Sequence, residues 1–222
     1  MCRAPYYNKE QGCYCPCGQC EYCLGKRIQN WTVRMMHQYE TSGRASFVTL
    51  TYRNEDLPQY NSLVKDDLQK YFKRVRYHYE KPVKYYACGE YGEETSRPHY
   101  HCIIFGIDPP EYNLLNEREN LWSFGHTFVG SSVAAESCAY VAKYVTKMIR
   151  GKGIDWSPRQ KPFQLQSQGL GKDWCDTHAD ELKKNSTSHK TDIRKECLGI
   201  IRNALESTRT TIQSLLGETT KK

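Results

Sequence analysis

The chain has 222 residues, a formal net charge of +7, 17 tyrosines and 11 cysteines. Its length favours one domain with appendages, and an excess of Lys and Arg with many aromatic rings suits a polyanionic partner, although a basic soluble enzyme has the same composition. The chain lacks an apolar run as long as a membrane span, and its N-terminus lacks the apolar core of a signal peptide. We therefore expect a cytoplasmic protein and exclude a membrane-spanning one.

The N-terminal region is rich in cysteine, with Cys13, Cys15, Cys17, Cys20 and Cys23 close together. In a cytoplasmic chain, a tight group of this kind favours a metal site over a set of disulfides. Cys17, Cys20 and Cys23, with Cys13 or Cys15 as the fourth, would supply the thiolates of a structural zinc ion. The spacing departs from two CxxC pairs separated by a long loop, so a reduced cluster without metal is an equal alternative.

The next segments predict a helix, a strand and a second helix. Residues 24–40 carry apolar side chains at helical spacing, and residues 45–52, ASFVTLTY, are rich in β-branched and aromatic residues. Residues 64–79 again have an apolar stripe with basic residues opposite. On that basic side Lys73 and Arg74 are candidate contacts to DNA phosphates, although a solvated basic surface explains them equally well.

Two further strands are predicted at residues 83–89 and 99–105, joined by a glycine-containing turn into an antiparallel hairpin. Side chains alternate along a strand, so His99 and His101 lie on one face. Two imidazoles on one face can bind one divalent cation, and Glu90, beside the end of the first strand, is our candidate for a third ligand. A hydrogen-bonded or solvated histidine pair without metal is the ordinary alternative.

The loop between these strands holds further candidates. Glu93 is the second choice for the carboxylate ligand, because the loop could bring either glutamate forward. Arg97 is a candidate DNA contact, and Pro98 restricts the backbone where the histidine strand starts.

Residues 112–122 predict a weaker helix, residues 125–129 a short strand and residues 134–149 a longer helix. The order of elements from residue 45 onwards is β-α-β-β-α-β followed by a helix. This order predicts an α+β fold, a ferredoxin-like split βαβ antiparallel sheet with helices on one face.

The last of these helices carries Tyr140 and Tyr144, four residues apart and on the same face as Lys143 and Lys147. The opposite side is apolar, so we expect the tyrosine face to be turned from the core, as an ordinary exposed surface would be. The histidine pair makes a tyrosine nucleophile the better interpretation. A phenol titrates near pH ~10, so its attack on a phosphodiester needs the cation to polarise the phosphate, with a lysine to lower the phenol's pKa or neutralise phosphate oxygens.

Three segments in this order, GEYG, RPHYHCIIFG and YVAKYVTK, resemble the HUH endonucleases, which are named for two histidines flanking a bulky hydrophobic residue. The likeness runs from about Cys13 to about Lys172 and is greatest to the replication initiators of microviruses, the gokushovirus-like single-stranded DNA phages. It implies an HUH nuclease domain at residues 43–150. A Cys-rich arm and helix at residues 1–42 would precede this domain, and an extension of loop and helix at residues 151–222 would follow it.

The resemblance implies a rolling-circle initiator that nicks single-stranded origin DNA with Mg²⁺ or Mn²⁺, forms a 5′-phosphotyrosine and rejoins strands. Its partners would be single-stranded and origin DNA with the replication helicase and polymerase of a bacterial host. Transposases and relaxases with similar motifs are the nearest alternatives, although relaxases usually carry their tyrosines before the histidine motif and such transposases typically have one tyrosine. A non-catalytic, zinc-stabilised DNA-binding module is the alternative from another class.

Overall fold

The structure is a computed structural model that describes residues 1–92, 94–130, 133, 135–150 and 155–180. The side chains at residues 135–136 and 145–150 are not described. Glu93 and the helix predicted near residues 193–204 lie outside the described residues. No helix in the described part of the chain is long and apolar enough to cross a bilayer.

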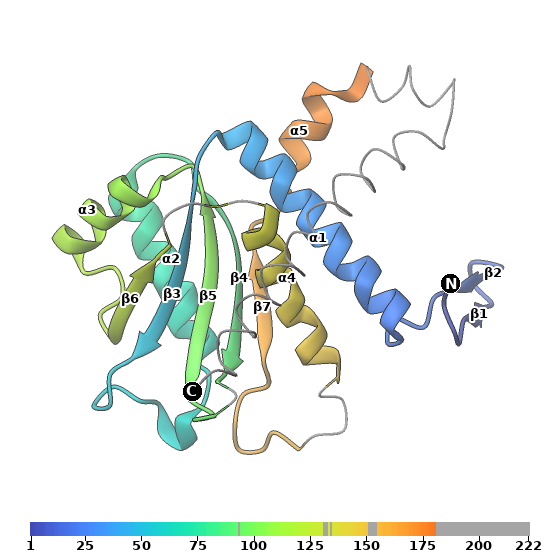
Figure 1. The fold of residues 1–222 in the computed structure, drawn as a ribbon, viewed down its shortest axis with the longest axis horizontal. Coiled ribbons are helices and arrows are strands. Elements are labelled where there is room, and N and C mark those ends of the chain that lie inside the picture. Colours follow the sequence, from blue (N-terminus) through green and yellow to red (C-terminus); the bar gives the residue numbers. More distant parts are fainter. Residues whose placement is uncertain (93, 131–132, 134, 151–154, 181–222) are drawn as a thin grey trace, which may run out of the picture.

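The order of elements follows the prediction from residue 45 to residue 150 and adds short elements on both sides (Figure 1). The elements are β1 (Tyr6–Asn8), β2 (Cys13–Cys15), α1 (Glu21–Ser42), β3 (Ala45–Tyr52), a 3₁₀ turn (Gln59–Asn61), α2 (Lys65–Tyr79), β4 (Lys84–Tyr91), β5 (Pro98–Phe105), α3 (Pro109–Glu119), β6 (Gly125–Val129), α4 (Ala135–Arg150), β7 (Phe163–Gln166) and α5 (Lys172–Thr177).

The main sheet has five antiparallel strands in the order β6-β3-β5-β4-β7. β3 and β4 each pair with β5, so they run in the same direction and α2 connects them as a crossover helix. The unit β3-α2-β4-β5-α3-β6, with its spatial order β6-β3-β5-β4, is the ferredoxin-like split βαβ arrangement. This confirms the predicted fold, to which β7 adds an edge strand that was not predicted.

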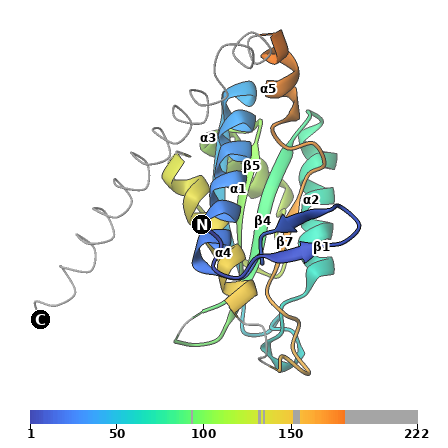
Figure 2. The ribbon, with the colours of Figure 1, turned by 90° about the vertical axis from the view of Figure 1, so that its right-hand side faces the viewer.

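Helices cover both faces of the sheet, so the prediction of helices on one face is wrong. Alternation along β5 places Tyr100, Cys102 and Ile104 in the core under α2 and α3, whereas Ile103 and Phe105 pack under α1 and α4. Figure 2 shows α1 and α4 on one side of the strands and α2 on the other. β5 is apolar on both faces from residue 102 onwards, and each face needs its own layer of helices.

Two element boundaries differ from the predictions in ways that matter for the site. β4 extends to Tyr91, so Glu90 lies inside the strand and pairs with His99. α3 begins at Pro109 rather than at Tyr112, because the Asp108 side chain accepts a hydrogen bond from the Glu111 backbone N–H and proline fits the first helical position.

Gly125 begins β6 where this strand crosses closest to β3. A Cβ added there would lie 2.1 Å from the Thr51 carbonyl oxygen and 2.6 Å from the Arg53 nitrogen. We expect Gly125→Ala to lower the free energy of unfolding by about 2 kcal/mol or more, because backbone on a paired strand must move. Denaturant unfolding of the full chain measures this loss.

The matched control is Gly25→Ala in α1, where an added Cβ meets nothing within 4 Å. Alanine forms helix better than glycine, so this variant should gain up to about 1 kcal/mol. Equal unfolding midpoints for Gly125→Ala and the unsubstituted chain would contradict the close approach of β6 to β3.

Candidate active site

The predicted metal ligands lie side by side on two adjacent strands. Glu90 is on β4, His99 and His101 are on β5, and the register pairs Glu90 directly with His99. All three point to the sheet face that α1 and α4 cover. Glu90 is 6% exposed and His101 is 8% exposed, while His99 is half-buried. We call these three residues the Glu–His–His site.

The ligand atoms of the Glu–His–His site converge on one point. The Nε2 atom of His99 lies 3.1 Å, and the Nε2 atom of His101 lies 3.2 Å, from the same carboxylate oxygen, Oε1 of Glu90. All three ligand atoms lie within 4.8 Å of one another. One divalent ion at ordinary coordination distances of about 2.0–2.2 Å can therefore reach all three.

Groups on β3 and before β5 fix the orientation of both imidazole rings. Nδ1 of His99 lies 3.0 Å from the Arg97 carbonyl oxygen, and Nδ1 of His101 lies 3.0 Å from the Thr49 hydroxyl oxygen. A carbonyl only accepts hydrogen bonds, so His99 carries its proton on Nδ1. These contacts are the outer-shell bonds that orient metal-binding histidines in general. The sequence analysis missed Thr49, and only its register opposite His101 would have revealed it.

This arrangement requires a cation. With the proton of His99 on Nδ1, the Nε2 lone pair of a neutral ring faces a carboxylate oxygen 3.1 Å away. Two acceptors at this distance repel each other unless a positive charge lies between them. A second proton on the ring or a metal ion meets this requirement, and the donor set of two imidazoles and one carboxylate suits a divalent metal.

α4 brings the two tyrosines over this site. The Tyr144 ring stacks on the His101 ring with centroids 5.0 Å apart, and the Tyr140 ring meets His101 edge-on at 5.8 Å. The two phenolic hydroxyls contact each other. Tyr140 is 43% exposed, whereas Tyr144 is 8% exposed. Burial, with the hydrogen bond from Tyr140, raises the pKa of Tyr144 above its usual value.

The prediction that the tyrosine face turns away from the core is therefore wrong. Both rings pack toward the sheet, where Phe47 and His101 offer aromatic surfaces, and Phe47 meets Tyr140 edge-on at 6.2 Å. The apolar side of α4, with Cys138, Val141 and Ala142, is also buried, so α4 is covered on more than one side.

The predicted basic residues are dispersed. Lys143 is exposed on α4 beside the tyrosines, whereas the side chain of Lys147 lies outside the described part of the structure. Arg97 donates a hydrogen bond to the Tyr52 carbonyl oxygen at 2.7 Å. Lys73 and Arg74 are on α2, across the sheet from the Glu–His–His site, and Arg74 Nε donates to the Leu121 carbonyl oxygen. The structure does not bring Lys73 and Arg74 to the candidate site.

A second group of ligand atoms lies at the N-terminal end of α1. It consists of Cys2, Cys17, Cys20 and Cys23, whose sulfur atoms lie within 4.8 Å of one another. Backbone N–H groups of Arg3 and Cys23 lower the pKa of Cys20 to about 6, whereas burial raises the pKa of Cys23 to about 12.

The fourth sulfur of this group corrects the sequence analysis, which named Cys13 or Cys15 for that place. Both lie in β2, and neither joins the group. β1 and β2 form a hairpin with Tyr6 opposite Cys15. Extending this register brings the chain before β1 alongside the chain after β2, and Cys2 therefore meets Cys17 and Cys20. Because the hairpin was not predicted, the sequence analysis gave Cys2 no place in the group.

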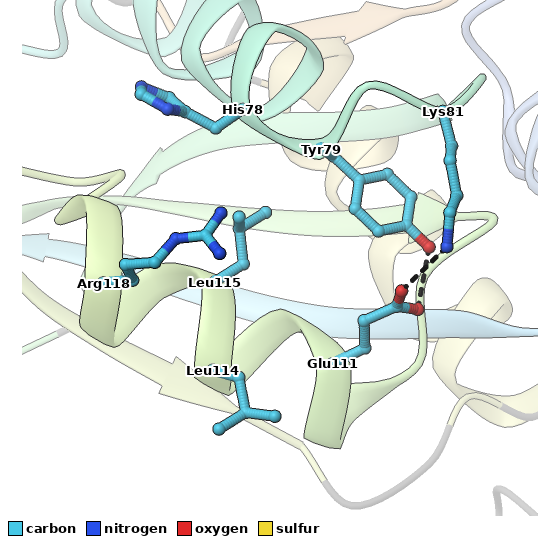
Figure 3. A pocket seen from close by; sticks show the side chains of 7 residues that line it. All are labelled: His78, Tyr79, Lys81, Glu111, Leu114, Leu115 and Arg118. Carbon is cyan, nitrogen blue, oxygen red and sulfur yellow. Dashed lines mark hydrogen bonds and ion pairs between the residues drawn. The ribbon is translucent and has the colours of Figure 1, made fainter.

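A hollow of about 220 Å³ lies elsewhere, between the end of α2 and α3 (Figure 3). Its charged groups are paired, since Tyr79 and Lys81 both contact Glu111 and His78 contacts Glu119. It belongs to the side of the sheet opposite the Glu–His–His site and takes no part in the candidate active site.

Residues 45–149 match a family model of phage-type replication proteins, the replication-associated protein ORF2 family. The chain is 31% identical over 182 residues to replication-associated protein ORF4 of Chlamydia phage 1, covering 72% of this chain and 45% of that protein. It is 27% identical over 187 residues to replication-associated protein VP4 of Bdellovibrio phage phiMH2K, covering 75% and 59%. It is 31% identical over 179 residues to replication-associated protein ORF2 of Spiroplasma virus 4, covering 68% and 55%.

The chain thus spans about half the length of the curated relatives it matches, between 45% and 59%. No solved structure matches it.

Proposed function

Residues 45–149 form a domain of the replication-associated protein ORF2 family in a chain homologous to phage replication-associated proteins, and on that premise we propose that the chain initiates rolling-circle replication. In this proposal it nicks single-stranded origin DNA through a tyrosine and later rejoins the strands. The observation that carries the proposal is the position of Tyr140 and Tyr144 over the Glu–His–His site.

Glu90, His99 and His101 would hold one Mn²⁺ or Mg²⁺ ion. Two imidazoles suit Mn²⁺ better than Mg²⁺, which prefers oxygen ligands. When bound, such an ion polarises the scissile phosphate and stabilises the charge that develops on it. The fit rests on the converging Nε2 and Oε1 atoms and on the protonated Nδ1 of His99.

The protein residues supply the nucleophile and its surroundings. The phenolic oxygen of a tyrosine forms a bond to phosphorus and loses its proton to solvent, while the bond from phosphorus to the 3′ oxygen breaks and that oxygen takes up a proton. The products are a 5′-phosphotyrosine and a free 3′-hydroxyl. The new bond keeps the energy of the phosphodiester, so attack by a 3′-hydroxyl reseals DNA without ATP.

Neighbouring residues position the strand and balance its charge. Lys143 is exposed next to Tyr140 and would neutralise a phosphate oxygen, and Lys147 follows one helical turn later. The proposed partners are single-stranded and origin DNA with the helicase and polymerase of a bacterial host, in whose cytoplasm the reaction would take place.

The experiment that tests the proposal is incubation of the protein with single-stranded phage DNA and Mn²⁺, followed by denaturing electrophoresis. We expect a covalent adduct that carries the 3′-labelled fragment, because the tyrosine keeps the 5′-phosphate. Chelation of the metal should prevent it. An adduct with the 5′-labelled fragment would refute the stated polarity, and DNA binding without any adduct would favour the non-catalytic, zinc-stabilised module.

The adduct alone does not separate an initiator from a transposase or relaxase, because all three use the same chemistry. Circular single-stranded product released from a template with two copies of the origin distinguishes the initiator. A strand transferred only to an unrelated target would support the transposase alternative.

A further inference from the structure

The four sulfur atoms at the start of α1 have the spacing of ligands around one ion. Sγ of Cys20 lies 3.5 Å from Sγ of Cys23 and 3.9 Å from Sγ of Cys2, and Sγ of Cys17 lies 3.9 Å from Sγ of Cys23. A tetrahedron of thiolates with zinc–sulfur bonds of about 2.3 Å has edges of about 3.8 Å. Disulfides need sulfur atoms about 2.05 Å apart, so none of these three pairs is one.

Backbone groups around the sulfurs favour their anionic form. The Cys17 N–H donates to Sγ of Cys2 at 3.2 Å, and the N–H groups of Gln19 and Cys20 donate to Sγ of Cys17 at 3.5 and 3.4 Å. Cys20 is the N-cap of α1, where the positive end of the helix dipole also stabilises anions. Four thiolates this close repel one another unless a cation binds them.

The segment tied together by these cysteines has no other source of stability within itself. None of residues 1–22 is buried, and β1 and β2 are three residues long each. Figure 1 shows the hairpin beyond the N-terminal end of α1, away from the main sheet. A hairpin of this size without an apolar core is not stable alone in water.

We propose that Cys2, Cys17, Cys20 and Cys23 bind one structural Zn²⁺ ion, which fastens the β1–β2 hairpin to the N-terminal end of α1. Cys2 precedes the hairpin and Cys17 follows it, so the ion closes the hairpin at its base. Cys20 and Cys23 anchor the ion to the first turn of α1. This site is separate from the Glu–His–His site, and its failure would leave the nuclease proposal untouched.

Metal analysis of the full chain, purified under reducing conditions, tests the proposal. We expect about one zinc per chain. Co²⁺ loaded in place of zinc should give the absorption of tetrahedral thiolate coordination. Cys2→Ser and Cys17→Ser should each lose most of the metal, whereas Cys13→Ser and Cys15→Ser in the same hairpin should keep it.

Limited proteolysis supplies a readout that does not depend on metal counting. Chelation should open the chain to trypsin at Arg3 and Lys9, while the part from β3 to α4 stays resistant. Absence of bound zinc in the reduced protein would overturn the proposal. So would retention of zinc by Cys2→Ser together with its loss from Cys13→Ser or Cys15→Ser, because the fourth ligand would then lie in β2.

Discussion

Replacing His99 or His101 by alanine is expected to abolish DNA cleavage while leaving the affinity for single-stranded DNA largely intact. Each histidine presents Nε2 to the same carboxylate oxygen of Glu90, so each substitution removes one of three converging ligands. Loss of an outer-shell partner alone typically costs 10–100-fold, and loss of a ligand should cost about 100-fold or more. The measurement is the rate of adduct formation with Mn²⁺, beside fluorescence anisotropy for binding.

Graded variants separate a metal site from a structural contact. Glu90→Gln keeps the shape of the side chain and removes its charge, so it should be as inactive as the histidine variants. Thr49→Val removes the hydroxyl 3.0 Å from Nδ1 of His101 and should slow cleavage about 10-fold, with recovery at higher Mn²⁺. His78→Ala, on the other side of the sheet, should cleave normally. Cleavage at the unsubstituted rate by the doubly substituted His99→Ala, His101→Ala protein would refute the site.

Most of the Glu–His–His site was predictable because it depends on local geometry. Alternation along one strand places His99 and His101 together, and a hairpin register brings the preceding strand alongside. The position of Glu90 inside β4 was not predicted, because strand ends are set by pairing with β5 and β7 rather than by composition. Thr49 was missed for a related reason, since the pairing of β3 with β5 joins residues 52 positions apart.

The long periodic elements were predictable, and the short ones were not. The apolar stripe of α1 packs as expected, with Met35 fully buried and Trp31 against Tyr86. β1, β2 and β7 have three or four residues each, too few to display an alternation. α5 is held by rings stacked between helices, with His37 on Trp174 at 3.7 Å. Such contacts leave no periodic pattern in the sequence.

The inward face of α4 shows a different limit of sequence analysis. Helical periodicity separates the tyrosine side from the apolar side, but it does not say which neighbours surround the helix. Tyr144 looked exposed because phenols and lysines share its side of the helix. It is buried because the sheet beneath offers His101 as a stacking partner. A polar site on a sheet can thus draw in a helix face that periodicity alone assigns to solvent.

The unequal burial of the two tyrosines leads to the second large effect that we expect. A chain with both Tyr140→Phe and Tyr144→Phe should form no adduct with DNA, because both phenolic oxygens near the Glu–His–His site are gone. Each single variant should retain some cleavage, since the two hydroxyls contact each other and either can approach the same site. Repeated strand transfer should suffer more than a single cut, because alternating attack needs both.

The two single variants should nevertheless differ. Tyr140 is 43% exposed and can receive an incoming strand directly, whereas Tyr144, at 8% exposure, is covered and must move from its stack on His101 before it attacks. We therefore expect Tyr140→Phe to slow the first cut more than Tyr144→Phe, and mass spectrometry of the digested adduct should place most of the nucleotide on Tyr140. The control is Tyr77→Phe on α2, where the side chain is 78% exposed on the other side of the sheet. A nucleotide found on serine, or an adduct formed by the doubly substituted chain, would refute the tyrosine mechanism, whereas a faster first cut by Tyr140→Phe than by Tyr144→Phe would reverse only the order of attack.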